Sequence, residues 1–291
     1  MDYVEAELKA VQVCIGRKTD WSDPTDLKDL GDKTLEEKLQ GDTTFKDLGL
    51  LKFFPTVLEL GDNVKVQNFG RNRGYCLIIS NPNKKIVVKK RQCSFEPEIA
   101  RKVAELGVGP RLLGTLSENI IVEEFVEGEP FTYEHLRSVP RQLGERVGEI
   151  YKRMHEAKIM YCDYFKSGDF RESAHLIVNT NDIAKSKFVD FGVATPIKNP
   201  KEMTSEEFVN WCFTIPGFGD MYAVDPENAA NYSLGQREFM IKKGLTVDEM
   251  IKMDISLVPM QFQWFPQSKK DAFILKEFFE AFNKGYGKKA I

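Results

Sequence analysis

The sequence predicts an α+β fold in which an antiparallel sheet comes first and a mostly helical part follows. Short apolar stretches separated by turn residues occupy positions 64–89, which is typical of an antiparallel meander. Residues 142–155 place their apolar side chains on one stripe of a helix, as a buried central helix requires. Within residues 158–192, two short apolar runs each end in an aspartate, Asp163 and Asp190, so two carboxylates can be held beside one cleft.

Composition is that of a soluble globular protein. The chain has 291 residues, with 42% hydrophobic and 29% charged residues, which suits one large domain or two smaller ones. Its net charge of −3 argues against a general nucleic-acid-binding protein, which is usually basic. No apolar run is long enough for a membrane span and the N-terminus lacks a signal-peptide pattern, so a cytoplasmic protein is expected. The five cysteines contain no CxxC pair, which favours reduced thiols.

The pattern changes twice along the chain, which predicts three segments. Residues 1–57 are charged and helical in pattern, and we expect a helical N-terminal extension there. Residues 58–126 carry the strand-like stretches, and residues 127–291 carry the helical ones. The second boundary follows from an apolar strand that breaks at a Glu-Gly pair before a helical pattern begins.

The first predicted hairpin carries a candidate phosphate-binding loop. Its turn has a glycine at each shoulder, Gly70 and Gly74, with Arg71 and Arg73 between them. The backbone N–H groups of such a loop can face nucleotide phosphates while an arginine adds positive charge. The loop lacks the full GxGxxG spacing, and the same residues also suit an ordinary hairpin turn.

A lysine and a glutamate are placed to form an ion pair near this loop. Lys89 ends the third strand on the same face as the apolar Val87, so its side chain can point into the cleft. In the helix that follows, Pro97 fits only the first turn and Glu96 falls on the buried stripe, from which it can reach Lys89. Glu98 lies off that stripe and is the second candidate. The simpler alternatives are a solvated strand-end lysine and an acid at a helix N-terminus.

These features follow the order found in the protein-kinase-like phosphotransferase superfamily. The stretch MHEAKIMYCD resembles the family pattern LHxxGIxHxD, with the same step from His155 to Asp163. Asp-Phe-Gly at residues 190–192 resembles the metal-binding signature of the family. The segments GVGPRLLG and IIVEEFVEGEPF look closest to atypical branches such as RIO-type kinases and choline or aminoglycoside kinases. The resemblance covers residues 64–194 and implies a two-lobed fold with an antiparallel-sheet N-lobe and a mostly helical C-lobe.

The resemblance implies nucleotide contacts for the residues of the first lobe. Lys89 resembles the lysine that holds the α and β phosphates of ATP, and Glu96 resembles its ion-pair partner. The backbone around Glu124 and Val126 resembles the hinge that binds adenine.

The resemblance also implies roles for the two aspartates. Asp163 resembles the catalytic aspartate that orients or deprotonates the acceptor hydroxyl, and Asp190 resembles the carboxylate ligand of Mg²⁺. Tyr161 stands where the family usually has a mostly structural histidine. Asp169, in the loop that follows, competes with Asp163 for the catalytic role.

The metal-binding asparagine of the family is replaced. The loop after Asp163 is longer than the family spacing, and His175 stands at the expected position. A neutral imidazole can ligate a metal, and manganese tolerates it better than magnesium. Asn179 or Asn181 takes this place if the alignment shifts. ATP with Mg²⁺ or Mn²⁺ is therefore the expected cofactor pair.

We expect an ATP-dependent phosphotransferase to a hydroxyl group. A Ser/Thr protein kinase is the leading expectation, because residues 216–227 resemble the end of an activation segment, GTxxYMAPE. The alternatives are a choline- or aminoglycoside-like small-molecule kinase, which the extended loop suits, and a pseudokinase acting as a binding module, which Tyr161 and His175 favour. The expected partners are ATP and a protein or small-alcohol acceptor, with no membrane and no general nucleic-acid binding.

Overall fold

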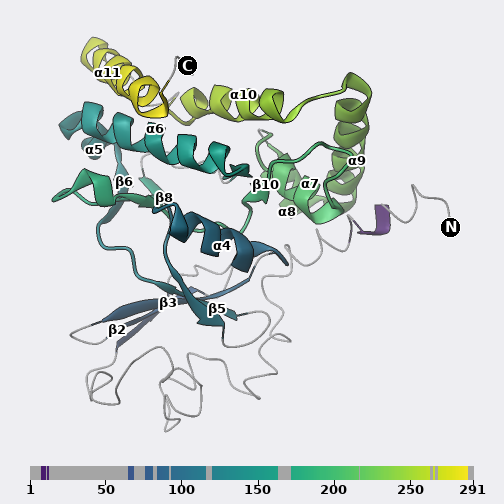
Figure 1. The fold of residues 1–291 in the computed structure, drawn as a ribbon, viewed down its shortest axis with the longest axis horizontal. Helices are drawn as coiled ribbons and strands as arrows, with labels where there is room; N and C mark the ends of the chain where they lie inside the picture. Colours follow the sequence, from purple (N-terminus) through teal and green to yellow (C-terminus); the bar gives the residue numbers. More distant parts are fainter. Residues whose placement is uncertain are drawn as a thin grey trace, which may run out of the picture.

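An antiparallel sheet and a larger group of helices divide the protein into two parts, with one helix, α4, lying between them (Figure 1). We describe the chain from a computed structural model, which covers residues 8–10, 12, 65–68, 76–80, 84–91, 93–115, 120–162, 172–215, 217–262, 265 and 268–287. The α+β, two-lobed arrangement predicted from the sequence is confirmed. The exact boundaries of the three predicted segments remain predictions.

The sheet of the first lobe has the strand order β1-β2-β3-β5-β4, and every neighbouring pair is antiparallel. Its strands are β1 (Lys65–Asn68), β2 (Cys76–Ser80), β3 (Lys85–Lys90), β4 (Leu112–Thr115) and β5 (Ile120–Glu124). The predicted meander is therefore present, with β5 added beside β3 by a crossover. Strand β3 is paired on both edges, and its alternate residues Ile86 and Val88 are fully buried on one face of the sheet.

Helix α4 (Glu96–Glu105) connects β3 to β4 and presents one buried stripe. Pro97 lies in its first turn, where the missing N–H leaves no hydrogen bond unmade. The stripe contains Glu96 together with apolar residues, as the spacing predicted. The helix ends beside Gly107, whose φ of 68° lies in the left-handed region that glycine adopts freely.

The second lobe is built around helix α6 (Pro140–Glu156), which packs along α11 (Lys269–Tyr286). The remaining helices of this lobe are α5 (Tyr133–Ser138), α7 (Ser205–Cys212), α8 (Phe218–Val224), α9 (Pro226–Lys243) and α10 (Val247–Leu257), with the 3₁₀ turns η3 (Ile183–Lys185) and η4 (Val258–Phe262). Capping boxes begin α7 at Thr204 and α10 at Thr246. Among the described residues, none of the helices combines the length and the apolar composition needed to cross a bilayer.

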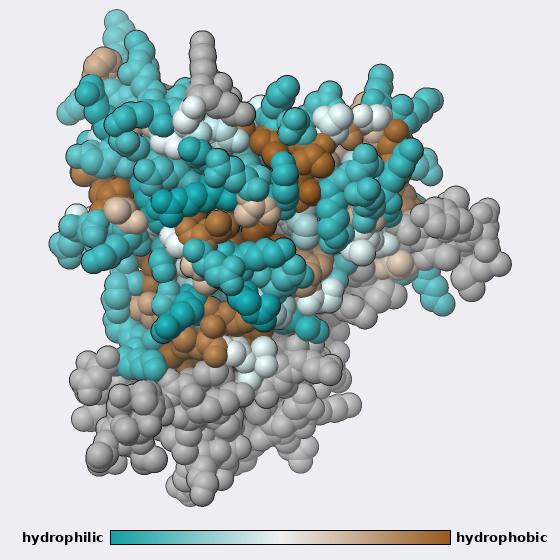
Figure 2. Space-filling model, in the orientation of Figure 1, coloured by the Kyte–Doolittle hydropathy of each residue, from teal (hydrophilic) through white to brown (hydrophobic). Residues whose placement is uncertain are grey.

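Two small sheets line the side of this lobe that faces the first one. Strands β6 (Glu129–Thr132), β8 (Glu172–Val178) and β9 (Lys187–Phe188) form the larger, in the order β6-β8-β9. Strands β7 (Ile159–Met160) and β10 (Thr195–Pro196) form the smaller, antiparallel pair. The face shown in Figure 2 is mainly hydrophilic, and hydrophobic residues emerge mostly in the seams between elements.

A buried polar contact joins three helices of the second lobe. His155, near the end of α6, lies 2.7 Å from a carboxylate oxygen of Asp254 on α10 and 2.9 Å from the hydroxyl of Tyr286 on α11. Burial raises the pKa of the Tyr286 hydroxyl to about 12, with a further contribution from Asp254. This contact places His155 in a structural role just before strand β7.

Of the predicted N-terminal extension, only residues 8–10 and 12 are described. Residues 8–10 are helical, and Leu8 packs against the main hydrophobic core. The rest of residues 1–57 lies outside the described part of the chain.

Residues 217–227, which resemble part of an activation segment in sequence, are largely helical in the structure. They form α8 and the first turn of α9, where Asp225 accepts a hydrogen bond from the N–H of Asn228 as the N-cap and Pro226 occupies the first turn. Phe218 is buried in the core. Gly217, Asp225 and Pro226, residue types that are common in turns, stand here at the starts of helices α8 and α9.

Close packing of α6 on α11 depends on glycine, and we expect Gly148→Ala to lower the free energy of unfolding by about 1–3 kcal/mol. A Cβ at this position would stand 2.2 Å from the carbonyl oxygen of Phe282, so one helix backbone must shift. Gly235→Ala on α9 is the matched control, because a Cβ there meets nothing within 4 Å. The control should gain about 0.5–1 kcal/mol from helix propensity. Urea unfolding followed by circular dichroism compares the two, and equal stabilities would contradict the close approach.

Candidate functional site

Four ionisable side chains from separate elements converge in one cluster between the lobes. The ammonium of Lys89 on β3 lies 2.9 Å from Glu96 Oε1 on α4, 3.3 Å from Glu123 Oε2 on β5 and 3.8 Å from Asp190 Oδ1 after β9. The side chains of Lys89, Glu96 and Glu123 are 9%, 0% and 4% exposed, whereas that of Asp190 is 36% exposed. The cluster is therefore closed at the glutamates and open to solvent at Asp190.

Strand register explains why Glu123 reaches Lys89. In the antiparallel pairing of β3 with β5, Val87 lies opposite Glu123 and Lys89 lies opposite Ile121. Alternate residues of a strand share a face, so Lys89 and Glu123 are diagonal neighbours on the same side of the sheet. The Lys89 side chain thus lies between one carboxylate from its own sheet and one from the helix that follows.

The cluster shifts the acid–base behaviour of two of its members. Burial lowers the pKa of the Lys89 ammonium, but the charges of Glu123, Glu96 and Asp190 outweigh it and hold that pKa well above its usual value. Burial raises the pKa of the Glu123 carboxyl to about 7, because the attraction of Lys89 only partly compensates for lost hydration. Lys89 is therefore firmly cationic, and Glu123 titrates near neutral pH.

Strained backbone marks the position of Asp190. Its φ is 60°, in the left-handed region that few residues other than glycine adopt, although aspartate is among the more tolerant. The chain is held there by pairing on both sides of the turn: Val189 N–H donates to the His175 carbonyl at 2.8 Å, and Ala194 N–H donates to the Phe191 carbonyl at 3.1 Å. Such strain is maintained where the surrounding structure requires a particular side-chain direction.

His175 on β8 lies near the second carboxylate oxygen of Asp190. Its Nδ1 lies 4.0 Å from Asp190 Oδ2, and its side chain is 25% exposed. Among the described residues, no group of three or more His, Cys, Asp or Glu side chains is placed to hold a metal ion. One carboxylate and one imidazole can still supply part of a coordination shell that nucleotide phosphates and water complete.

Tyr161 couples the end of β7 to the Asp190 turn. Its hydroxyl donates a hydrogen bond to the Val189 carbonyl, and its ring meets that of Phe191 edge-on, with 5.1 Å between centroids. Tyr161 thus connects the segment that precedes Asp163 to the Asp190 turn. Cys162, which precedes Asp163, has a φ of 60° and repeats the strain seen at Asp190. Asp163 itself lies outside the described residues.

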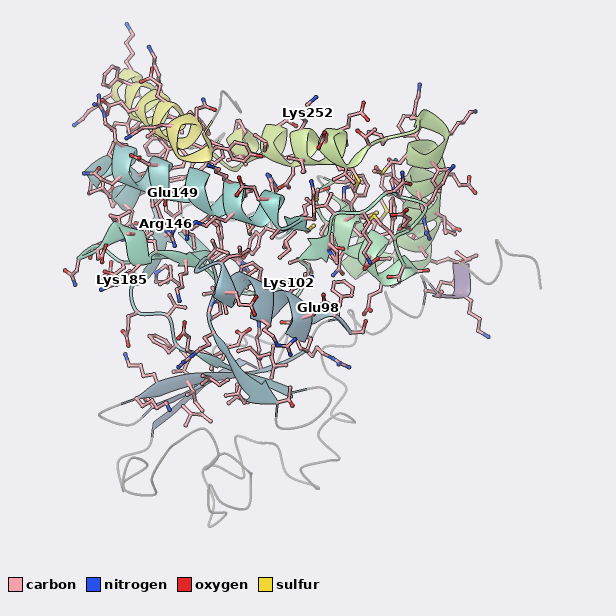
Figure 3. The ribbon with its side chains drawn as sticks, in the orientation of Figure 1. Glu98, Lys102, Arg146, Glu149, Lys185 and Lys252 are labelled. Atoms are coloured by element: carbon pink, nitrogen blue, oxygen red, sulfur yellow. The ribbon has the colours of Figure 1, made fainter. Side chains whose placement is uncertain are left out.

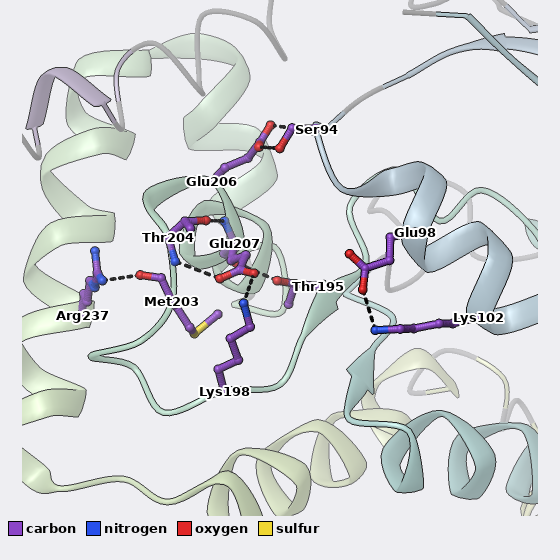
Figure 4. Close-up of polar contacts among 10 residues, drawn as sticks. All are labelled: Ser94, Glu98, Lys102, Thr195, Lys198, Met203, Thr204, Glu206, Glu207 and Arg237. Atoms are coloured by element: carbon purple, nitrogen blue, oxygen red, sulfur yellow. Dashed lines mark hydrogen bonds and ion pairs between the residues drawn. The ribbon is translucent and has the colours of Figure 1, made fainter. Parts of the chain in front are cut away.

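Helix α4 is held to the second lobe at both of its ends. Ahead of its first turn, the hydroxyl of Ser94 donates to the Glu206 carboxylate on α7, and the Ser94 N–H donates to Oε1 of the same carboxylate at 3.1 Å (Figure 4). Beyond its last turn, Arg146 of α6 donates to the carbonyls of Gly107 and Ser186, at 2.9 Å each (labelled in Figure 3). These contacts fix the position of Glu96 relative to Asp190.

The structure distinguishes between the two candidate partners of Lys89. Glu98 points away from the cluster and pairs with Lys102, one helical turn later, at 2.7 Å (Figures 3 and 4). Only Glu96 of the two reaches Lys89. The periodicity argument therefore selected the residue that forms the contact.

At the end of β5, the side chain of Glu124 faces away from Lys89. It lies 2.8 Å from the Lys187 ammonium of β9 and 3.7 Å from Arg111. These three side chains line an open hollow of about 600 Å³ beside α4. Val126 follows β5 outside any strand and is half-buried.

The predicted site residues fall into three groups. The structure brings Lys89, Glu96, Asp190 and His175 together, whereas Glu124 and Val126 lie at the end of the neighbouring strand. The others lie outside the described residues: Gly70, Arg71, Gly74 and Asp163. Their roles, and those of the residues in the cluster, remain predictions.

One member of the cluster, Glu123, was not predicted. Alternation along residues 120–124 places Glu123 on the same face as Ile121, but the face of β3 that it meets depends on register. The available signal was a pair of adjacent acids, Glu123 and Glu124, directly after the apolar residues of the strand.

Comparisons with known proteins give little beyond this geometry. No protein-family model matches the chain, and no curated protein matches it by sequence. Among solved structures, an ethanolamine kinase from Plasmodium vivax is similar, with a TM-score of 0.41 and 10% identity, over 91% of this chain and 94% of that chain. At that level of similarity we draw nothing about function from the likeness.

Proposed function

We propose that this chain is an ATP-dependent phosphotransferase whose acceptor is the hydroxyl group of a small molecule. The observation that supports it best is the Lys89 cluster, in which a buried ammonium paired with Glu96 lies 3.8 Å from the more exposed Asp190 carboxylate. Lys89 and Glu96 come from the consecutive elements β3 and α4, whereas Asp190 comes from much later in the chain, after β9.

The charges of the cluster suit a polyphosphate. Phosphoryl transfer depends on neutralising charge on the phosphate oxygens and on positioning, with little covalent chemistry by the protein. A permanently charged ammonium in a poorly hydrated site attracts an anion more strongly than one in water. Because exposure increases from Glu96 to Lys89 to Asp190, the ligand approaches from the side of Asp190.

The residues fit a divalent cation on the open side of the cluster. Asp190 offers the hard carboxylate oxygen that Mg²⁺ prefers, and His175 adds an imidazole that Mn²⁺ accepts more readily. A bound cation would neutralise phosphate charge. The strained backbone and the Tyr161 hydrogen bond keep the Asp190 carboxylate oriented. Asp163, on sequence grounds alone, is the proposed acceptor-orienting base.

Two observations favour a small acceptor over a protein. Residues 193–204, between the Asp-Phe-Gly stretch and α7, are pinned to the lobe: β10 pairs with β7, and Ile197 N–H donates to the Lys158 carbonyl at 2.7 Å. The stretch that suggested an activation segment, residues 217–227, forms α8 and the start of α9. Residues 193–215 and 217–227 are thus largely tied to β7 or folded into helices α7, α8 and α9, which favours a small acceptor over a docked peptide.

Transfer of label from ATP tests the proposal. We expect full-length protein, given labelled ATP with Mg²⁺ or Mn²⁺, to phosphorylate at least one member of a panel of amino alcohols, polyols and sugars. Generic protein acceptors are tested in parallel, and nucleotide binding is measured by calorimetry. Glu98→Gln should leave transfer unchanged, because this acid lies on the same helix as Glu96 but pairs with Lys102.

The other outcomes each point to one rival. Label on protein acceptors alone would indicate a Ser/Thr protein kinase. Nucleotide binding without transfer to any acceptor, under either metal, would indicate a pseudokinase that serves as a binding module. An absence of nucleotide binding would overturn the proposed function altogether.

A further inference from the structure

Lys89 has a second buried carboxylate, Glu123, that the proposed function does not use. A single partner, Glu96 at 2.9 Å, is sufficient to orient the ammonium. Glu123 adds a carboxylate 3.3 Å away on the same face of the sheet, with its side chain only 4% exposed. Burying a further carboxylate beside one lysine costs desolvation free energy that a single ion pair would not.

We propose that Glu123 takes up one proton when the phosphates of a nucleotide engage Lys89, so that nucleotide binding is coupled to proton binding. The inference rests on the proposed function, because it takes the ligand to be a nucleoside di- or triphosphate. The step is a simple proton transfer: one proton leaves the buffer and bonds to a carboxylate oxygen of Glu123, and Lys89 keeps its own proton.

The charges around Lys89 supply the reason. When all groups are ionised, three carboxylates face one ammonium, so the cluster already carries excess negative charge. Phosphate oxygens that approach Lys89 add further negative charge to a poorly hydrated site, which favours the neutral form of the least stabilised acid. Protonation of Glu123 removes one of the negative charges that compete for the Lys89 ammonium. Lys89 then pairs with Glu96 and with the phosphate.

Glu123 is the member of the cluster placed to accept this proton. Its contact with Lys89 is longer than that of Glu96, and it is much less hydrated than Asp190. The charged groups that face it come from three elements: Lys89 of β3, Glu96 of α4 and Asp190 after β9. Across the other edge of its strand, Glu123 is paired with the apolar Leu112 of β4. The pKa of about 7 for the Glu123 carboxyl means that it loses its proton within the physiological range in the free protein.

The coupling predicts a pH dependence of a stated sign. Above pH 7 the free protein carries an ionised Glu123, whereas the complex keeps it protonated. The dissociation constant for ADP with Mg²⁺ should therefore rise with pH, by up to about tenfold per unit, until the pH exceeds the raised pKa in the complex. Glu123→Gln, which resembles the protonated acid in shape, should bind with weaker pH dependence and more tightly at pH 8.

Calorimetry of ADP with Mg²⁺ at pH 8, in two buffers of different ionisation enthalpy, counts the protons directly. We choose ADP because it cannot be turned over and is fully ionised at this pH. The wild-type protein should take up about one proton more per bound nucleotide than Glu123→Gln, as expected for one titrating acid. Glu98→Gln, an equal chemical change outside the cluster, should behave as wild type.

The outcomes separate this inference from the proposed function. If ADP binds and the wild-type protein and Glu123→Gln take up equal numbers of protons, the inference is wrong while the proposed function stands. If wild-type protein takes up no proton, the inference is wrong whether or not the variant folds. If ADP does not bind at any pH, the proposed function fails, and this inference fails with it.

Discussion

Lys89→Met is expected to lower the free energy of unfolding by about 3–5 kcal/mol, the cost typical of removing one partner from a buried ion pair. The substitution leaves Glu96 and Glu123, whose side chains are 0% and 4% exposed, without the ammonium that lies within 3.3 Å of both. Methionine is nearly as long as lysine, so the decrease in the free energy of unfolding reflects the missing positive charge and not a cavity. Nucleotide binding should disappear with it.

The pH dependence of this loss has a definite sign. Burial raises the pKa of the Glu123 carboxyl to about 7 in the folded wild-type protein, above its value in an unfolded chain. That group therefore costs stability as the pH rises through the interval up to 7. Without Lys89 the pKa of the Glu123 carboxyl rises further, so the deficit of Lys89→Met relative to wild type should grow between pH 6 and pH 8.

Urea unfolding at both pH values measures the deficit, and two further variants interpret it. Lys85→Met alters a lysine on the same strand whose side chain is 44% exposed beside Glu127, and it should cost at most about 1 kcal/mol. Adding Glu96→Gln and Glu123→Gln to Lys89→Met should restore much of the stability but none of the nucleotide binding. A cost for Lys89→Met no greater than that of Lys85→Met would show that the buried cluster does not form.

Asp190→Asn is expected to reduce phosphoryl transfer by at least about 10²–10³-fold, the range associated with loss of one electrostatic group at a reacting centre. Asparagine keeps the shape of the side chain and tolerates the left-handed backbone found at Asp190, so the turn should survive. What is lost is the negative charge on the exposed side of Lys89, where a cation would bind. Stability should change little or increase, because one of three competing carboxylates is removed.

Initial rates at saturating ATP and metal measure the effect, with unfolding curves as a check on the fold. Asp182→Asn is the matched control, because Asp182 caps η3 through a hydrogen bond that asparagine can also accept, and it is 46% exposed. The control should transfer label at the wild-type rate. Activity of Asp190→Asn within tenfold of wild type would remove Asp190 from the metal-binding role.

Helices with a strong apolar stripe were predicted well, and helices without one were not. The stripe in residues 142–155 identified α6, which extends over Pro140–Glu156, because burial against α11 selects for that spacing. By contrast, α9 (Pro226–Lys243) contains Asn, Ser, Gly and Ala and buries few residues, so it carries little periodicity and no helix was predicted there. Strands β7 and β9 overlap the two short apolar runs that precede Asp163 and Asp190, whereas the two-residue strand β10 is defined by its pairing with β7.

The sequence by itself determined the order of the elements and one contact of the site, because both depend on local spacing. Alternation on β3 and the stripe on α4 were enough to pair Lys89 with Glu96 and to set Glu98 aside. Only the tertiary structure decided that Glu123 joins them and that Asp190 lies on the open side. Those placements depend on the register of β3 against β5 and on how α6 and α7 hold α4, which are interactions between residues far apart in the chain.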